Sequence, residues 1–202
     1  MKIETIILIT YISSLTILFF FASHGFSMIY LYFKTFNKRT ENIDEKDFII
    51  DDYPFVTIQL PLYNEKYVIC RLIDATLRLD YPKDKLEVQI LDDSTDDTKN
   101  IIENHIKKYK EKGYIINHIH RTNRQGYKAG ALKEGLKSAM GEFVAIFDAD
   151  FIPRKNFLKR TIPYFLKSEK IGLVQTRWEH LNRDYSILTK TQAIALDGHF
   201  VV

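Results

Sequence analysis

The sequence has little cysteine and little net charge, and each shortage excludes a class of protein. Cys70 is the one cysteine among 202 residues, so no internal disulfide can form and nothing indicates an oxidising compartment. The formal net charge of +3 is too small for the dense basic face that nucleic-acid-binding domains usually show, so no nucleic-acid partner is expected. Repeats and low-complexity stretches are also absent. With 46% hydrophobic and 27% charged residues, the composition is that of a folded protein rather than of a disordered or fibrous chain.

Charged side chains are missing altogether from the segment Thr5–Phe33. About 20 apolar residues in a helix cross the hydrocarbon core of a bilayer, so this segment is long enough to span a membrane. A cleaved signal peptide is the alternative, but its apolar region usually holds only about 7–15 residues. The segment here is longer than that, and an aromatic cluster that includes Phe26 continues it. We therefore predict a retained transmembrane helix within residues 1–36.

Basic residues flank this segment unequally. The residues that follow it include Lys34, Lys38 and Arg39. At the other end Lys2 is offset by Glu4. The positive-inside rule then predicts an integral membrane protein with residues 34–202 in the cytoplasm. Residues 37–52 are mostly polar, and we interpret them as a linker to the folded part.

Beyond the linker, predicted strands and helices alternate. The apolar, β-branched runs that indicate strands are 55–60, 86–91, 114–120, 142–147 and 172–176, and the runs with helical periodicity are 65–79, 95–112, 128–140 and 155–167. The strands begin about 30 residues apart, which is the size of a βαβ unit. The fold class is therefore α/β with a mainly parallel sheet, in one domain over residues 53–183. Ligands of such sheets bind at the carboxyl ends of the strands.

Polar residues gather where the predicted strands end. They are Tyr63, Asn64 and Glu65 after the first strand, Asp92 and Asp93 after the second, Lys128 after the third, and Asp148 and Asp150 after the fourth. Hard divalent cations take carboxylate oxygens and keep phosphate oxygens as further ligands, and an anion near a helix start explains a lysine there. The set therefore favours a site for a metal ion and a diphosphate. Taken singly, each acid also fits a turn or a helix cap, and the lysine fits a solvated side chain.

Taken together, these motifs resemble the processive, membrane-embedded family 2 glycosyltransferases, which include cellulose synthases, mannan synthases and glycolipid glucosyltransferases. The resemblance is carried by Pro61-x-Tyr63-Asn64-Glu65, Asp92-Asp93-Ser94, Lys128-Ala129-Gly130-Ala131-Leu132 and Phe147-Asp148-Ala149-Asp150. Two further runs, 174–182 and 196–200, resemble the mannan synthase branch. The resemblance covers residues 53–202.

The resemblance implies a GT-A fold and a nucleotide-sugar donor, UDP-glucose or GDP-mannose, held through Mg²⁺ or Mn²⁺. Its donor-binding residues are Tyr63, Asn64, Glu65, Asp92, Asp93, Lys128 and Asp148, and its metal ligands are Asp148 and Asp150. Within that set, Asp92 would support its loop and Lys128 would contact the diphosphate. The implied reaction is an inverting transfer of a hexose to a polysaccharide or lipid acceptor. The implied location is the plasma membrane or a Golgi-type membrane.

The sequence departs from the family pattern after the acid pair. The catalytic base of the family lies in a Thr-Glu-Asp-like motif, and no acid after Asp150 stands in one. The family motif Gln-x-x-Arg-Trp is also missing, since the run Gln175–Trp178 has one residue too few. We therefore expect this chain to be the N-terminal part of a longer enzyme, with the base beyond Val202. Residues 184–202 would begin an amphipathic helix on the membrane surface.

Other readings of the same residues lead to different functions. A non-catalytic sugar-nucleotide-binding module that needs a partner chain stays open. A phosphohydrolase that uses Asp148-x-Asp150 is less favoured, because its acid pair would follow the first strand rather than the fourth. The glycines do not form the G-x-G-x-x-G motif of a dinucleotide-binding oxidoreductase. His118 and His120 share one strand face, but a zinc site would need further ligands.

Overall fold

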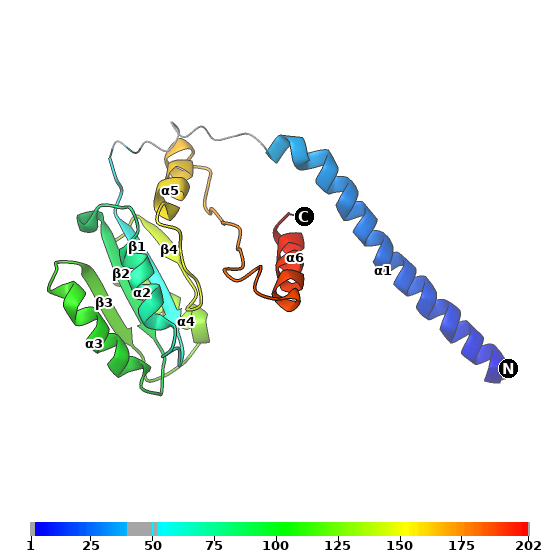
Figure 1. Ribbon diagram of the computed structural model, residues 1–202, viewed down its shortest axis with the longest axis horizontal. Coiled ribbons are helices and arrows are strands. Elements are labelled where there is room, and N and C mark those ends of the chain that lie inside the picture. Colours follow the sequence, from blue (N-terminus) through cyan, green and yellow to red (C-terminus); the bar gives the residue numbers. More distant parts are fainter. Residues whose placement is uncertain (1–2, 40–49, 51, 202) are drawn as a thin grey trace. The chain divides into compact units, whose positions relative to one another are not determined.

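The computed structural model describes residues 3–39, 50 and 52–201 (Figure 1). The chain divides into two compact units, one of residues 1–43 with 175–202 and one of residues 44–174. The first contains the helices α1 (Ile3–Arg39) and α6 (Ile187–Val201). The second contains a four-stranded sheet and the helices around it. Each unit is described by itself below.

Helix α1 contains the predicted membrane-spanning segment. Its stretch Ile3–Leu31 has a mean hydropathy of 2.2, so α1 is long and apolar enough to cross a membrane. The hydroxyls of Thr10 and Thr16 donate to backbone carbonyls one turn earlier, at 2.9 and 2.8 Å. These bonds satisfy polar groups that would be costly to expose to lipid. The helix extends three residues past the predicted end at 36, and most of the predicted linker lies outside the described residues.

The sheet is entirely parallel, as predicted. It consists of β1 (Val56–Leu62), β2 (Leu86–Asp92), β3 (Ile115–His120) and β4 (Phe143–Ile146), in the spatial order β3-β2-β1-β4. Val56 pairs with both Leu86 and Phe143, which aligns the carboxyl ends of neighbouring strands. The helices of this unit are α2 (Ile69–Leu77), the short 3₁₀ turn η2 (Lys83–Lys85), α3 (Thr98–Lys110), α4 (Tyr127–Leu136) and α5 (Phe157–Lys167). The parallel sheet with helices between its strands confirms the predicted α/β class.

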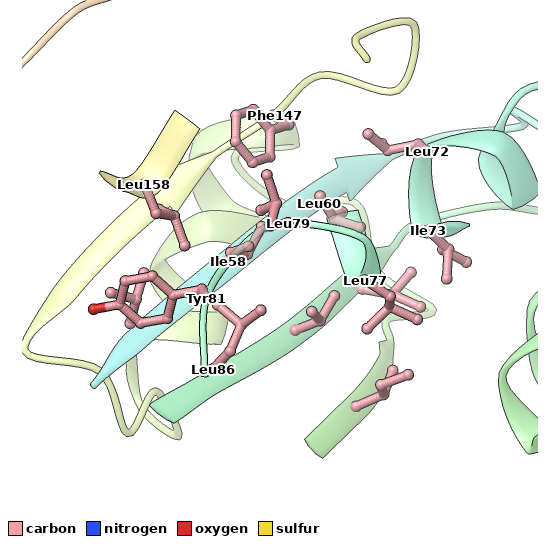
Figure 2. Close-up of a cluster of buried hydrophobic side chains, with 14 of the residues drawn as sticks. Ile58, Leu60, Leu72, Ile73, Leu77, Leu79, Tyr81, Leu86, Phe147 and Leu158 are labelled. Atoms are coloured by element: carbon pink, nitrogen blue, oxygen red, sulfur yellow. The ribbon is translucent and has the colours of Figure 1, made fainter. Parts of the chain in front are cut away.

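One face of the sheet carries the apolar core. Ile58 and Leu60 of β1 are fully buried, and so are Val88 and Ile90 at the paired positions of β2. Figure 2 shows the β1 side chains among those of α2, α5 and the segment between α2 and β2. Because strand side chains alternate between faces, Thr57 and Gln59 of β1 and Glu87 and Gln89 of β2 point to the opposite face.

That opposite face is polar and equally closed. The Glu87 carboxylate is fully buried and accepts hydrogen bonds from the Thr57 hydroxyl at 2.7 Å, the Asn117 amide at 2.8 Å and the Met140 backbone N–H at 3.0 Å. Helix α4 covers this face through Gly135, where an added Cβ would lie 2.6 Å from the amide nitrogen of Gln59. These hydrogen bonds satisfy the buried oxygens of Glu87, and the network holds α4 and the turn before β4 on the sheet.

Two features of the predicted sheet are wrong. The run 172–176 forms no strand, and Leu173 within it is 78% exposed. The nearly all-apolar run 142–147 is typical of a strand covered on both faces, yet Val144 and Ile146 of β4 are exposed. In the described part of the chain, β4 is an edge strand paired only with β1. An apolar, β-branched run indicates strand tendency, but a strand forms only where another strand supplies its hydrogen bonds.

Candidate functional site

The loops after β1 and β2 are joined to each other at the carboxyl edge of the sheet. Asn64 lies in the left-handed region with φ of 57°, and its backbone N–H donates to the Ser94 hydroxyl at 2.8 Å. Its side-chain oxygen accepts the Thr95 backbone N–H at 2.9 Å. The Asp93 backbone N–H also donates to the Leu62 carbonyl at 3.1 Å. These bonds fix the two loops, which are about 30 residues apart in sequence, relative to each other.

Asp92, at the end of β2, is fully buried and has a partner at each carboxylate oxygen. Oδ1 accepts the Ser94 backbone N–H at 2.8 Å. Oδ2 lies 3.0 Å from Nε2 of His118 and 3.3 Å from Nδ1 of His120. Burial raises the pKa of the Asp92 carboxyl, but the bonds from His118 and Ser94 outweigh it and leave the pKa below its ordinary value. Asp92 is therefore an ionised group that faces the interior rather than a ligand.

Asp93 points to a different partner, Arg121 at the end of β3. The guanidinium makes a two-bond contact, with Nε 2.7 Å from Oδ1 and Nη2 2.5 Å from Oδ2. Arg121 Nη2 also donates to the Tyr127 carbonyl at 3.1 Å. The hydrogen bonds to Asp93 raise the pKa of the Arg121 guanidinium above its ordinary value. Arg121 is not among the site residues predicted from the sequence, although it too follows directly after a strand.

Helix α4 starts with an unusual backbone. Gly126 before it has a φ of 73°, and Tyr127 has a φ of 48°. An added Cβ on Gly130 would lie 2.0 Å from the Gln125 carbonyl oxygen, so the motif at 128–132 needs glycine at this position. This tight turn directs Lys128 toward β4, where its ammonium forms an ion pair with Asp148.

The second acid pair is far more open than the first. The Asp148 side chain is 36% exposed, and Asp150 is exposed in the turn closed by the Phe151 N–H on the Asp148 carbonyl. Within residues 3–39, 50 and 52–201, no group of three or more His, Cys, Asp or Glu side chains could hold a metal ion. Two carboxylates nevertheless fit Mg²⁺ or Mn²⁺ chemistry where diphosphate oxygens and water complete the ligands. These two carboxylates therefore suit a metal ion that binds together with a diphosphate-containing substrate.

Aromatic residues lie beside these charges. The guanidinium carbon of Arg124 is 3.3 Å from the ring centroid of Tyr63 and 5.3 Å from that of Tyr127. Both rings are exposed in part, Tyr127 more than Tyr63. Sequence reasoning included Tyr63 but missed Arg124. Glu65 is half-buried, and its carbonyl accepts the backbone N–H groups of Val68 and Ile69 as α2 begins.

Several of the predicted residues are thus linked by contacts at the strand ends. Asn64 contacts Ser94, neighbouring Asp93 contacts Arg121, Arg121 donates to the Tyr127 carbonyl, and Lys128 pairs with Asp148. The sequence profile described as Glycosyl transferase family 2 matches residues 57–195, which include all four loops. The chain belongs to glycosyltransferase family 2. The predicted family is thereby confirmed.

Curated relatives of this family 2 chain are plant enzymes. It is 47% identical over 154 residues to glucomannan 4-beta-mannosyltransferase 9 of Arabidopsis thaliana, covering 74% of this chain and 29% of the relative. It is 37% identical over 205 residues to the probable glucomannan 4-beta-mannosyltransferase 10 of the same plant, covering 96% of this chain and 37% of that one. The chain thus spans about a third of the length of these relatives.

Solved structures of similar fold carry nucleotide ligands. The mannosyltransferase PcManGT from Pyrobaculum calidifontis, in complex with GDP-Man and Mn²⁺, has a TM-score of 0.61 and 30% identity, and covers 71% of this chain and 41% of that one. S. aureus TarS 1–349, in complex with UDP-GlcNAc, has a TM-score of 0.50 and 26% identity, and covers 62% of this chain and 38% of that one.

Proposed function

We propose that this chain is the donor-binding part of a membrane-bound mannosyltransferase that uses GDP-mannose and extends a polysaccharide. The observation that carries the proposal is the set of contacts at one edge of the sheet, of Asn64 with Ser94, Asp93 with Arg121 and Lys128 with Asp148. The names of the curated relatives and the GDP-Man complex of PcManGT favour mannose and guanosine over glucose and uridine. UDP-glucose is the alternative donor, and a lipid is the alternative acceptor.

The charges of the site match the two ends of a nucleoside diphosphate. Asn64, Glu65 and Asp93 would lie by the nucleoside, with the Arg124–Tyr63 stack beside them. Lys128 would exchange its ion pair with Asp148 for the diphosphate, because a phosphate oxygen is a strong acceptor for an ammonium. Asp148 would then be free to act with Asp150.

Asp148 and Asp150 would hold the divalent cation, Mg²⁺ or Mn²⁺. Such an ion, when bound, stabilises the negative charge of a leaving nucleoside diphosphate. The residue that takes the proton of the acceptor hydroxyl is not assigned among the described residues. Two of the later acids are already paired, Asp197 with Arg177 and Arg183, and Asp184 with Lys190.

Helix α1 would fix this domain at a membrane, with residues 34–202 on the cytoplasmic side of a plasma or Golgi-type membrane. Its length and apolar character support that role. The cytoplasmic side is also where nucleotide sugars would reach the domain. Helix α6, which begins at Ile187 inside the range expected for a membrane-surface helix, would lie along the same membrane.

Calorimetry on the 202-residue chain in detergent micelles tests this function. We expect GDP-mannose to bind in the presence of Mn²⁺, to bind at least about tenfold more weakly after chelation, and to bind more tightly than UDP-glucose. Binding of neither nucleotide sugar would refute the donor-binding role. Equal affinities for both would remove the preference for GDP-mannose and leave the metal-dependent donor site.

A further inference from the structure

We propose that His118 is a positioning residue for the donor site, which holds the loop after β2 through the buried carboxylate of Asp92. The inference rests on the proposed function, because the loop matters only if it binds the donor. His118 itself does not face the proposed ligand; three hydrogen bonds connect it to Asn64 in the loop after β1. The steps are a hydrogen bond to Asp92, one from Ser94 to Asp92, and one from Asn64 to Ser94.

The imidazole of His118 lies between two carboxylates. Its side chain is 7% exposed, with Nε2 3.0 Å from Oδ2 of Asp92 and Nδ1 4.0 Å from Oε1 of Glu103 on α3. His118 pairs with Ile90 in the β2–β3 register, and Asp92 pairs with His120. An ionised carboxylate only accepts hydrogen bonds, so Nε2 of His118 must carry the proton in this contact. The hydrogen bond to Asp92 therefore fixes the imidazole, while the Glu103 carboxylate lies near its other nitrogen.

The contacts of Asp92 lead directly to the donor loops. Its other oxygen accepts the Ser94 backbone N–H, which fixes the turn that carries Asp93. The Ser94 hydroxyl in turn accepts the backbone N–H of Asn64, a residue in the left-handed region. A side chain that holds Asp92 in place therefore sets the geometry of two loops at once. Hydrogen bonds to a charged acceptor are strong enough for such a role.

The molecule also contains a matched pair elsewhere. His105 of α3 has its Nε2 2.6 Å from Oδ1 of Asp74 on α2, and the Tyr109 hydroxyl donates to the same oxygen at 2.6 Å. Both histidine–aspartate pairs are largely buried and join neighbouring elements. The Asp74 pair joins two helices, whereas the Asp92 pair ends in a loop of the site. Replacing each histidine in a separate variant therefore distinguishes two effects. Loss of His105 reports a general loss of stability, and loss of His118 also reports a change in the loop.

The experiment compares three variants of the 202-residue chain in detergent micelles. His118→Phe removes the N–H group that donates to Asp92. His118→Gln restores an N–H near the position of Nε2, and His105→Phe is the control. We expect His118→Phe to weaken GDP affinity in Mn²⁺ by about tenfold, and His118→Gln to recover most of that loss. His105→Phe should leave GDP affinity within about twofold, because its pair does not reach the loop.

Hydrogen exchange at the Ser94 and Asn64 amides gives a readout that needs no nucleotide. His118→Phe should speed exchange at both amides, and His105→Phe should not. If His118→Phe changes neither exchange nor GDP affinity relative to His105→Phe, the inference is wrong. If the unaltered chain binds no GDP, the proposed function fails, and the exchange data still decide whether His118 positions the loop. Should His118→Phe fail to fold, His118→Asn, whose shorter amide does not reach Asp92, takes its place.

Discussion

The two acid pairs at the strand ends differ in how much of their environment the protein supplies. Asp92 and Asp93 are buried, and each has partners on both oxygens. Asp148 and Asp150 are open to solvent, and Asp148 forms an ion pair with Lys128. A buried charge must be compensated within the fold, whereas an exposed charge can wait for a ligand. The first pair is thus organised during folding, and the second is left open to solvent, where the proposed function places a metal ion and a diphosphate.

The largest effect is expected from removing the buried carboxylate. Asp92→Ala leaves His118 and the Ser94 N–H without their acceptor, so the free energy of unfolding should fall by about 3 kcal/mol or more. Asp148→Ala, the matched change in the open pair, should alter it by about 0.5 kcal/mol or less. Urea unfolding followed by circular dichroism measures both. Similar losses for the two variants would contradict the distinction between the pairs.

Affinity should respond in the opposite order. Asp150→Asn should weaken Mn²⁺-dependent binding of GDP-mannose by about a hundredfold while unfolding stays unchanged, because the group serves a ligand rather than the fold. Glu142→Gln is the control, since this exposed acid makes the same carboxylate-to-amide change at the other end of β4. Calorimetry with and without Mn²⁺ gives the result. Unaltered metal-dependent affinity in Asp150→Asn would remove Asp150 from the metal site.

A smaller change is expected at the cation between the pairs. Lys128→Ala should weaken GDP by about tenfold and guanosine by about twofold or less, because the ammonium would contact phosphate and not the nucleoside. Lys133→Ala, an exposed lysine further along α4, is the control and should leave both affinities within about twofold. Equal losses of GDP and guanosine in Lys128→Ala would contradict the assigned contact.

The smallest effect is on the acid limit of stability. The folded pKa of Asp92 lies below its ordinary value of 3.8, so its stabilisation is fully present above about pH 4 and is lost as the pH falls through the lowered folded value. Between pH 6 and pH 3, the urea concentration at the unfolding midpoint should therefore fall less in Asp92→Asn than in the unaltered chain. An Asp92→Asn variant as acid-sensitive as the unaltered chain would show that other groups control this limit.

The sequence was sufficient to bring the predicted site residues to one edge of the sheet but not to describe their contacts. Strand spacing and the rule for parallel sheets brought residues 63–65, 92–93, 128 and 148–150 to one edge, because chain order alone fixes which ends of parallel strands meet. Which side chain faces which is set by register and by helix packing. His118 and His120 were correctly predicted to share a strand face, but sequence gave no sign that Asp92 lies against both.

The errors have the same physical origin. The run 172–176 has the composition of a strand, and β4 has that of a fully covered one. Neither composition says whether a neighbouring strand offers free hydrogen-bonding groups. Arg121 and Arg124 were missed because arginines in loops are usually solvated, and only the fold shows that one reaches Asp93 and the other stacks on Tyr63. The positive φ of Tyr127 likewise follows from the tight packing at Gly130.

Arg121 donates hydrogen bonds both to the Asp93 carboxylate and to the carbonyl of Tyr127, the residue before Lys128. Under the proposed assignment, one side chain connects the part of the pocket for the nucleoside with the part for the diphosphate. Because these bonds are formed before any ligand binds, the spacing between the two parts is already set, and a nucleoside diphosphate would lose less entropy on binding than it would to two independent loops.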